Sequence, residues 1–132
     1  MSEAWLLDTQ LLVWLSCRPE RLGNALISDL SDRKRPVHYS VVSLWEVAIK
    51  ASLGRPDFQI DAHALRGGLQ QEGFLELPIA AEHVLAVQDL PWIHRDPFDR
   101  LLVVQARREG LRLVTADRTL MGYGEGVHWV DS

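Results

Sequence analysis

Short apolar runs alternate with longer stretches in which leucine and valine recur every three or four residues. A short apolar run between turn residues predicts a buried strand, whereas the three- and four-residue spacing predicts a helix with one buried face. By this criterion the expected strands are residues 4–7, 37–40, 74–77, 111–115 and 127–130. The expected helices are residues 9–16, 19–30, 41–53, 61–71, 80–90 and 97–108, with a helical turn at 117–121. Strands that alternate with helices need crossover connections, so we expect an α/β fold with a parallel sheet covered on both faces.

Turn and breaker residues separate these elements. A polar segment at 31–36 divides the second expected helix from the second strand, and Gly110 ends the last long helix. The Gly67-Gly68 pair is expected to interrupt the helix over 61–71, because glycine weakens helix interiors. The sequence contains no internal repeat, low-complexity segment or linker, so we predict a single domain over residues 1–132.

Size and charge limit the classes of function. The 132 residues suffice for a real core, and 47% hydrophobic with 24% charged residues is ordinary for a globular protein. A net charge of −4 argues against a protein that binds nucleic acid through an overall positive charge. An enzyme that acts on nucleic acid remains compatible with this charge, because acids that hold a metal ion make the net charge negative.

The sequence predicts a cytoplasmic protein that does not interact with membranes. No apolar run approaches the roughly 20 residues that a membrane span needs. The start, Met1 to Ala4, lacks the basic residues of a signal peptide. The lone Cys17 excludes an internal disulfide and a cysteine-built metal site, and we expect it to be buried or half-buried.

The chain is organised around the stretch from His94 to Leu102. Asp96 is expected to cap a helix that begins at Pro97, which puts Asp99 in the first turn of that helix. Two interpretations of Asp99 stay open: it can stabilise the helix dipole, or its carboxylate can point into a cleft.

Three further acids lie near the ends of expected strands. Asp8 comes directly after the first strand, Asp117 two residues after the fourth, and Glu46 early in the helix after the second. In a parallel sheet such positions gather at the carboxyl edge, where ligands bind. Asp8 and Asp117 can instead cap helices. Glu46 can instead form a capping box with Ser43 or an ion pair with Lys50.

Several carboxylates at one edge of a sheet repel one another unless a cation lies between them. Oxygen ligands favour hard cations, so these acids predict Mg²⁺ or Mn²⁺. The five histidines lack the H-x-x-x-H and H-E-x-x-H spacings of zinc sites. Nucleotide-binding and serine-hydrolase motifs are also missing, so those functions lack support.

Four segments together resemble the PIN-domain ribonucleases, and most closely the VapC-like toxins of bacterial toxin–antitoxin pairs. They occur in the family's order and extend over nearly the whole chain: Leu6–Thr9, Ser43–Lys50, His94–Leu102 and Leu113–Asp117. The resemblance implies a three-layer α/β/α sandwich whose central parallel sheet has about five strands. It also implies an acidic quartet that binds metal and catalyses the reaction: Asp8, Glu46, Asp99 and Asp117. The supporting residues are Thr115, Thr9 and Asp96.

The implied activity is Mg²⁺- or Mn²⁺-dependent hydrolysis of RNA phosphodiester bonds, which leaves 5′-phosphate and 3′-hydroxyl ends. Asp8 and Asp99 would hold one ion, while Asp117 and Glu46 would bind through water or hold a second ion. Cations that flank the motifs are candidates to meet substrate phosphates or to orient the acids: Lys50, Arg55, Arg95, Arg100 and Arg118.

The resemblance also implies a small cognate antitoxin and a homodimer. Trp14, Trp45 and Trp92 are candidate antitoxin contacts because aromatic residues are enriched at interfaces. Core packing is the alternative that we expect for each of them.

Three other functions stay open on the sequence. A non-catalytic RNA- or protein-binding module can share the same fold. A phosphatase with Asp8 as nucleophile is disfavoured, because Gln10 stands where that mechanism needs a second aspartate. The acids alone do not distinguish an RNA nuclease from a DNA nuclease.

Overall fold

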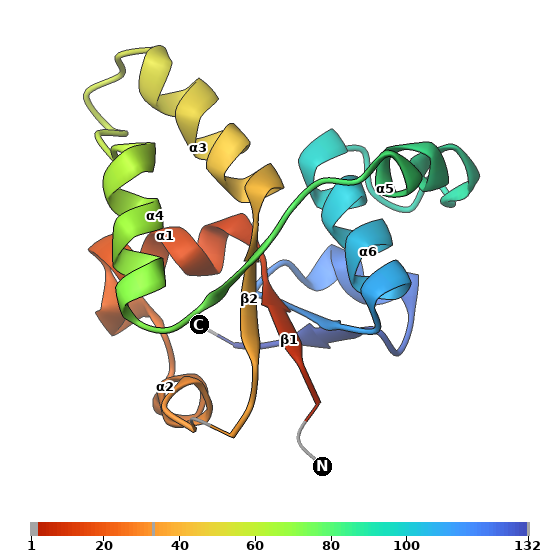
Figure 1. Ribbon diagram of the computed structural model, residues 1–132, viewed down its shortest axis with the longest axis horizontal. Helices are drawn as coiled ribbons and strands as arrows, with labels where there is room; N and C mark the ends of the chain where they lie inside the picture. The colour runs from red at the N-terminus through yellow and green to blue at the C-terminus, as the bar shows by residue number, and fades with distance from the viewer. Residues whose placement is uncertain (1–2, 33, 132) are drawn as a thin grey trace.

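Five short parallel strands form the central sheet, in the order β3-β2-β1-β4-β5 (Figure 1). The computed structural model describes residues 3–32 and 34–131. Met1 and Ser2 of the expected chain start, and Arg33 of the expected polar segment, lie outside the described residues. The strands are β1 (Trp5–Leu7), β2 (Val37–Ser40), β3 (Leu75–Leu77), β4 (Arg112–Thr115) and β5 (Val127–Trp129). Every pairing is parallel, which confirms the predicted sheet.

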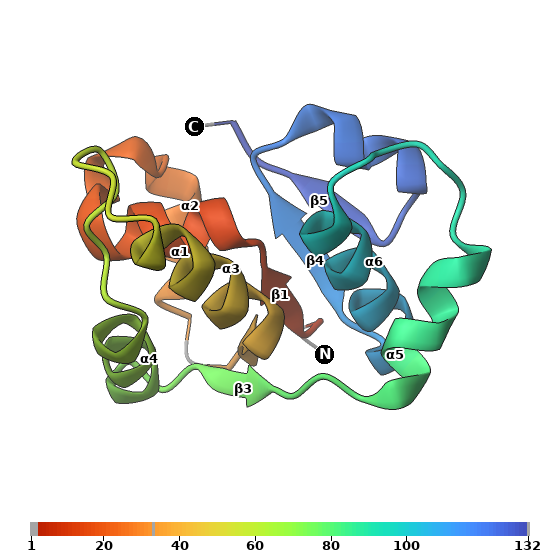
Figure 2. The ribbon, with the colours of Figure 1, turned by 90° about the horizontal axis from the view of Figure 1, so that it is seen from above.

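Helices cover both faces of the sheet (Figure 2), which confirms the three-layer arrangement. The α-helices are α1 (Thr9–Cys17), α2 (Asn24–Leu30), α3 (Val41–Ser52), α4 (Ala62–Gln71), α5 (Ala81–Ala86) and α6 (Pro97–Glu109). The 3-10 helices are η1 (Pro19–Arg21), η2 (Val87–Asp89) and η3 (Arg118–Tyr123). Within residues 3–32 and 34–131, no helix is long and apolar enough to span a bilayer.

The alternation of side chains along β1 divides the core into two layers. Trp5 and Leu7 pack with residues of α1, α2 and α4, whereas Leu6 points to the other face and packs with α6. These side chains are almost completely buried. A strand buried on both faces accounts for the uninterrupted apolar run that predicted it.

The order of the strands fixes where a site can form. From β1 the chain moves outward through β2 to β3, and it then returns to the other side of β1 to form β4 and β5. The direction of winding therefore reverses between β1 and β4, and ligands bind at the carboxyl ends of strands at such a switch point. Asp8 follows β1 at this edge, and its N–H donates to the Val114 carbonyl at 3.0 Å.

A buried polar contact holds together the two helices on either side of this edge. The Ser40 hydroxyl, at the start of α3, donates to Gln105 Oε1 of α6 at 2.5 Å. Gln105 Nε2 in turn donates to the Pro78 carbonyl at 3.2 Å. Because Ser40 and Gln105 are fully buried, separating α3 from α6 would leave both polar groups without partners.

Several expected boundaries need correction. The helix predicted over 19–30 is two elements, η1 and α2, because Gly23 adopts an extended conformation between them. The Gly67-Gly68 pair does not interrupt α4, whose Leu65 and Leu69 are anchored in the core. The helix predicted over 80–90 tightens into η2 after Ala86.

Candidate metal centre

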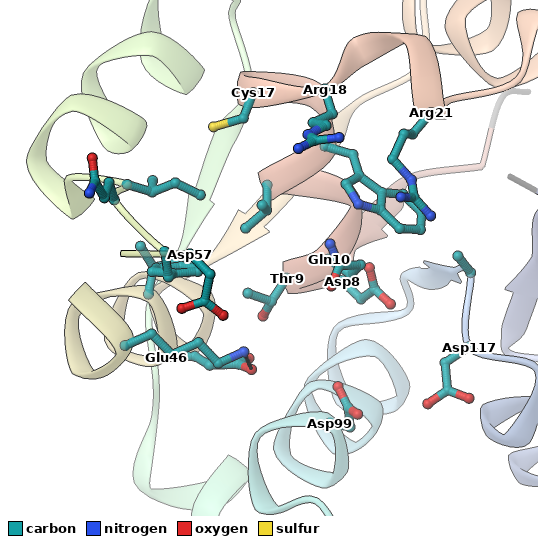
Figure 3. Close-up of a pocket in the computed structure, with 18 of the residues that line it drawn as sticks. Asp8, Thr9, Gln10, Cys17, Arg18, Arg21, Glu46, Asp57, Asp99 and Asp117 are labelled. Carbon is teal, nitrogen blue, oxygen red and sulfur yellow. Dashed lines mark hydrogen bonds and ion pairs between the residues drawn. The ribbon is translucent and has the colours of Figure 1, made fainter. Parts of the chain in front are cut away.

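Five carboxylates line one cleft of about 730 Å³ at the carboxyl edge of the sheet: the four predicted acids and Asp57, which the sequence did not single out (Figure 3). The four predicted acids come from different parts of the chain: Asp8, Glu46, Asp99 and Asp117. Each lies at, or within two turns of, the N-terminus of a helical element: α1, α3, α6 or η3. Helix N-termini carry partial positive charge, which makes the gathering of acids at this edge less unfavourable.

The carboxylate of Asp8 has two structural partners. Its Oδ1 accepts from the Leu11 N–H at 2.9 Å and so caps α1. Its Oδ2 accepts from the Thr115 hydroxyl at 2.5 Å, and Thr115 Oγ1 itself accepts from the Asp117 N–H at 2.9 Å. Thr115, expected to support the site, therefore links two of the four acids. Asp8 is both a helix cap and a residue of the cleft, so its capping interpretation and its placement at the carboxyl edge of the sheet are both correct.

Glu46 is not part of a capping box, which corrects one alternative from the sequence. The cap of α3 is Ser40, so Ser43 lies inside the helix, where its Oγ accepts from Thr9 Oγ1 at 2.8 Å. This bond ties α1 to α3. The expected ion pair is present, with Lys50 Nζ 3.1 Å from Glu46 Oε2. The other oxygen, Oε1, is buried and has no hydrogen-bond partner among the residues that the structure describes.

The stretch around Asp99 folds locally as predicted. Asp96 caps α6 by accepting from the Asp99 N–H at 3.0 Å, and Pro97 is the first residue of the helix. The Asp99 side chain is directed into the cleft (Figure 3). Gly110 ends the helix in a left-handed conformation, with φ of 67°.

His94 belongs to the site, although the spacing of the histidines gave no sign of it. Its Nδ1 accepts from the Asp96 N–H, so the proton lies on Nε2. Nε2 lies 2.9 Å from Asp117 Oδ2 and 3.6 Å from Asp99 Oδ2. One ligand atom from each of His94, Asp99 and Asp117 falls within 4.8 Å of the others. The sequence feature that could have indicated His94 is its position two residues before Asp96, the cap of α6.

The environment moves the pKa values of three acids in different directions. Burial raises the pKa of Asp8 to about 6, despite the hydrogen bonds from Thr115 and Leu11. Burial and the charges of Asp96 and Asp8 raise the pKa of Asp99 to about 7. For Asp117 burial is outweighed by hydrogen bonds from Thr119 and His94, which lower its pKa.

These features fit a hard divalent cation, which prefers oxygen ligands. The donor set is dominated by carboxylates, and Glu46, whose buried Oε1 has no hydrogen-bond partner among the described residues, lines the same cleft. A cation there would offset the desolvation of Asp8 and Asp99, whose raised pKa values report the unfavourable burial of charge.

Arg100 is a structural residue, which corrects its assignment to substrate binding. The side chain is 3% exposed and does not line the cleft. Its guanidinium donates to four main-chain carbonyls of the preceding loop and stacks on the Trp92 ring, 3.8 Å from the centroid. Those carbonyls belong to Val87, Leu90, Pro91 and His94. Arg100 thus fixes the loop that positions His94.

The remaining predicted cations are distributed differently. Lys50 lines the cleft, whereas Arg55, Arg95 and Arg118 do not, and Arg118 covers the Trp129 ring at 4.9 Å. Two arginines that the sequence did not single out, Arg18 and Arg21, do line it.

Exposure corrects the expectations for the cysteine and two tryptophans. Cys17 is exposed, not buried. Trp45 and Trp92 are 52% and 76% exposed, so core packing is wrong for both, while Trp14 is half-buried against the core. Trp45 packs edge-on against Phe98 of α6.

Comparison with known proteins gives a family and a fold. The PIN domain family model matches residues 5–124. No curated protein matches the sequence. Among solved structures, VapBC2 from Rickettsia felis bound to a DNA fragment from its promoter is 13% identical, with a TM-score of 0.73 and 98% of each chain covered. DNA-bound VapBC from Salmonella typhimurium is 18% identical, with a TM-score of 0.65 and 99% and 98% coverage of this chain and that chain. VapBC-5 from Mycobacterium tuberculosis is 17% identical, with a TM-score of 0.58 and 98% coverage of both.

Replacing Arg100 by lysine tests its structural role. Lysine keeps the charge but cannot donate to the same set of carbonyls, so Arg100→Lys should lower the free energy of unfolding by about 2–4 kcal/mol. Urea unfolding followed by circular dichroism measures this change. Arg108→Lys, in an exposed ion pair with Glu82, is the control and should change stability by less than about 0.5 kcal/mol. Equal stability of Arg100→Lys and the unmodified protein would contradict the assignment.

The raised pKa of Asp99 predicts a pH-dependent stability of the metal-free protein. Between about pH 4 and 7 the folded state keeps a proton that the unfolded chain has lost, so stability falls as the pH rises through this window. Asp99→Asn removes the buried charge and should stabilise the chelator-treated protein at pH 8 by on the order of 1–3 kcal/mol. Denaturant unfolding at pH 4 and pH 8 gives the comparison. The exposed Asp29→Asn is the control, and a destabilised Asp99→Asn at pH 8 would refute the prediction.

Proposed function

Because this chain belongs to the PIN domain family, we propose that it is a metal-dependent endoribonuclease that acts as a VapC-like toxin of a toxin–antitoxin pair. The observation that supports this most directly is the convergence of four carboxylates from distant parts of the sequence on one cleft. Two of them have pKa values raised by burial, so the cleft gains stability from a bound cation.

The quartet would hold Mg²⁺ or Mn²⁺. When bound, such an ion supplies positive charge to the reacting phosphate and makes water more acidic. The residues assigned to it are Asp8, Glu46, Asp99 and Asp117. The raised pKa values mean that Asp8 and Asp99 release protons on binding it, so its affinity should increase with pH.

The neighbours of the quartet hold its oxygens in place. Thr115 fixes Asp8 by a hydrogen bond from its hydroxyl, and the Leu11 N–H fixes the other oxygen of the same carboxylate. His94 donates to Asp117 and lies between it and Asp99, which keeps these two carboxylates close despite their charges. Fixed ligands reduce the rearrangement needed when the substrate phosphate enters the cleft.

Glu46 has a different environment from the aspartates. Lys50 engages its Oε2, while the buried Oε1 has no hydrogen-bond partner in the part of the chain that the structure describes. In the proposal Oε1 binds the ion or accepts a proton from the attacking water. Both tasks need an oxygen that no protein donor already occupies.

A protein partner follows from the same proposal. Structures with the same fold include a toxin–antitoxin complex from Klebsiella pneumoniae, 17% identical with a TM-score of 0.62. We assign to this chain a small cognate antitoxin, a homodimeric state and a cytoplasmic location. The exposed Trp45 and Trp92 offer apolar area for such contacts.

Cleavage of a defined single-stranded RNA tests the activity. The unmodified protein should cleave it in Mg²⁺ or Mn²⁺, stop in chelator, and leave 5′-phosphate ends. Asp99→Asn and Glu46→Gln should each lower kcat/KM at least about 100-fold, equivalent to about 2.7 kcal/mol of transition-state stabilisation. Glu82→Gln removes an exposed acid away from the cleft and is the control. Cleavage that persists in chelator would reject the metal mechanism, and RNA binding without cleavage would favour the non-catalytic module.

Thr115→Val tests whether the hydroxyl orients the acids. The substitution nearly preserves shape but removes the donor to Asp8 and the acceptor for the Asp117 N–H. Activity or metal affinity should fall about 10- to 100-fold, the range typical for groups that orient metal ligands. Metal titration of the cleavage rate measures both effects. Thr115→Ser keeps the hydroxyl and should restore most of the activity, and an equal loss in both variants would contradict the positioning role.

A further inference from the structure

One face of α1 and η1 forms a wall of the cleft. The lining residues of this face recur at helical spacing: Gln10, Val13, Trp14, Cys17, Arg18 and Arg21. Figure 3 labels Gln10, Cys17, Arg18 and Arg21 among them. The wall therefore begins beside Asp8 and ends in two arginines. Nine helical residues span about 13 Å, so the backbones of Asp8 and Arg18, which flank α1, lie at opposite ends of the helix. We call Arg18 and Arg21 the cationic rim.

The cationic rim differs from several other cations of the described residues in its ion pairing. Across residues 3–32 and 34–131, neither Arg18 nor Arg21 forms an ion pair. Other cations differ: Lys50 in the same cleft is paired with Glu46. Three arginines outside the cleft are also paired with carboxylates: Arg66, Arg108 and Arg112. The cleft thus combines clustered carboxylates with two arginines that form no ion pair with any described carboxylate.

Arg21 is held in position by an aromatic ring. Its guanidinium lies over the half-buried Trp14, 4.7 Å from the ring centroid. Stacking of this kind orients the planar group and leaves its N–H edge available for an anion. Trp14 packs against the core and cannot easily move away. Because Arg21 is held in place, an anionic ligand can bind it without a rearrangement of the arginine side chain.

We propose that the cationic rim binds a phosphate of the substrate strand other than the one that is cleaved. This inference rests on the proposed nuclease function. Asp8 and Arg18 flank α1 at opposite ends, and a strand with a phosphate in every nucleotide can contact the acids with one phosphate and the rim with another. Arginine is suited to phosphate because its fork donates two parallel hydrogen bonds. The rim would also help a substrate approach a protein with a net charge of −4.

Binding and cleavage by a double variant, Arg18→Ala/Arg21→Ala, test the proposal. Fluorescence anisotropy with a labelled single-stranded RNA is measured in the Asp99→Asn background over a series of salt concentrations. Loss of the rim should weaken binding about 10-fold and make the dependence of log Kd on log salt shallower by about 0.7 for each lost phosphate contact. In the otherwise unmodified protein, kcat/KM should fall for a long RNA and stay unchanged for a dinucleotide, which has no second phosphate.

Two control variants separate charge at the rim from other effects. Arg66→Ala/Arg108→Ala removes the same charge from exposed pairs outside the cleft and should leave the salt dependence of RNA binding unchanged. Arg18→Lys/Arg21→Lys keeps the charge and should retain most of the slope. Circular dichroism shows whether each variant is folded.

The outcomes distinguish the rim from the nuclease function. If the unmodified protein cleaves RNA and the alanine variant has the same slope and the same kcat/KM, the rim proposal is overturned and the nuclease stands. If the unmodified protein neither binds nor cleaves RNA, both proposals are overturned. If RNA binding is unchanged but an acidic peptide binds only when Arg18 and Arg21 are present, the rim is a protein-docking site and the proposal is wrong.

Discussion

Mutual repulsion among carboxylates gathered at one edge of a sheet is the constraint around which this protein is built. Burial makes the repulsion worse, and it raises the pKa values of Asp8 and Asp99 to about 6 and 7. The surrounding groups reduce the penalty: helix N-termini supply N–H donors, Thr115 donates a hydroxyl, and His94 lies between Asp117 and Asp99. What they leave uncompensated, including Glu46 Oε1, is what a divalent cation would complete.

Helix capping and the candidate chemistry use the same side chains. Asp8 caps α1 with one oxygen and turns the other toward Thr115. Asp117 caps η3 through Oδ1 and accepts from His94 through Oδ2. A cap fixes the carboxylate relative to the helix axis, and a fixed carboxylate is a better-placed ligand. Structural and functional interpretations of an acidic residue at the end of a strand are therefore not alternatives in this fold.

Along α1 the wall of the cleft changes sign, from Asp8 before the first residue of the helix to Arg18 and Arg21 after its last. Such an arrangement suits a polyanion that is to be cut rather than merely held, because the acids repel phosphate until a cation screens them. A net charge of −4 is therefore compatible with the RNA substrate proposed above. The sign of the local charge, not the sum over the chain, decides where a strand can lie.

The sequence determined the features that depend on neighbouring residues. Apolar runs and helical spacing located the five strands, and Asp96-Pro97 and Gly110 located the two ends of α6, because dihedral preferences and capping act over a few residues. Asp8, Glu46 and Asp117 could be predicted to converge because parallel strands share a carboxyl edge, whereas the resemblance to PIN-domain ribonucleases grouped Asp99 with them. Features that depend on contacts between distant segments were decided only by the tertiary structure. Arg100 is buried against carbonyls of the preceding segment, and His94 contacts Asp117 across 23 positions of the chain. The end of α1 and η1 bring Arg18 and Arg21 to the cleft. The local sequence pattern predicts which helix or strand a segment forms. The residues that a side chain contacts depend on which distant segments the fold places beside it.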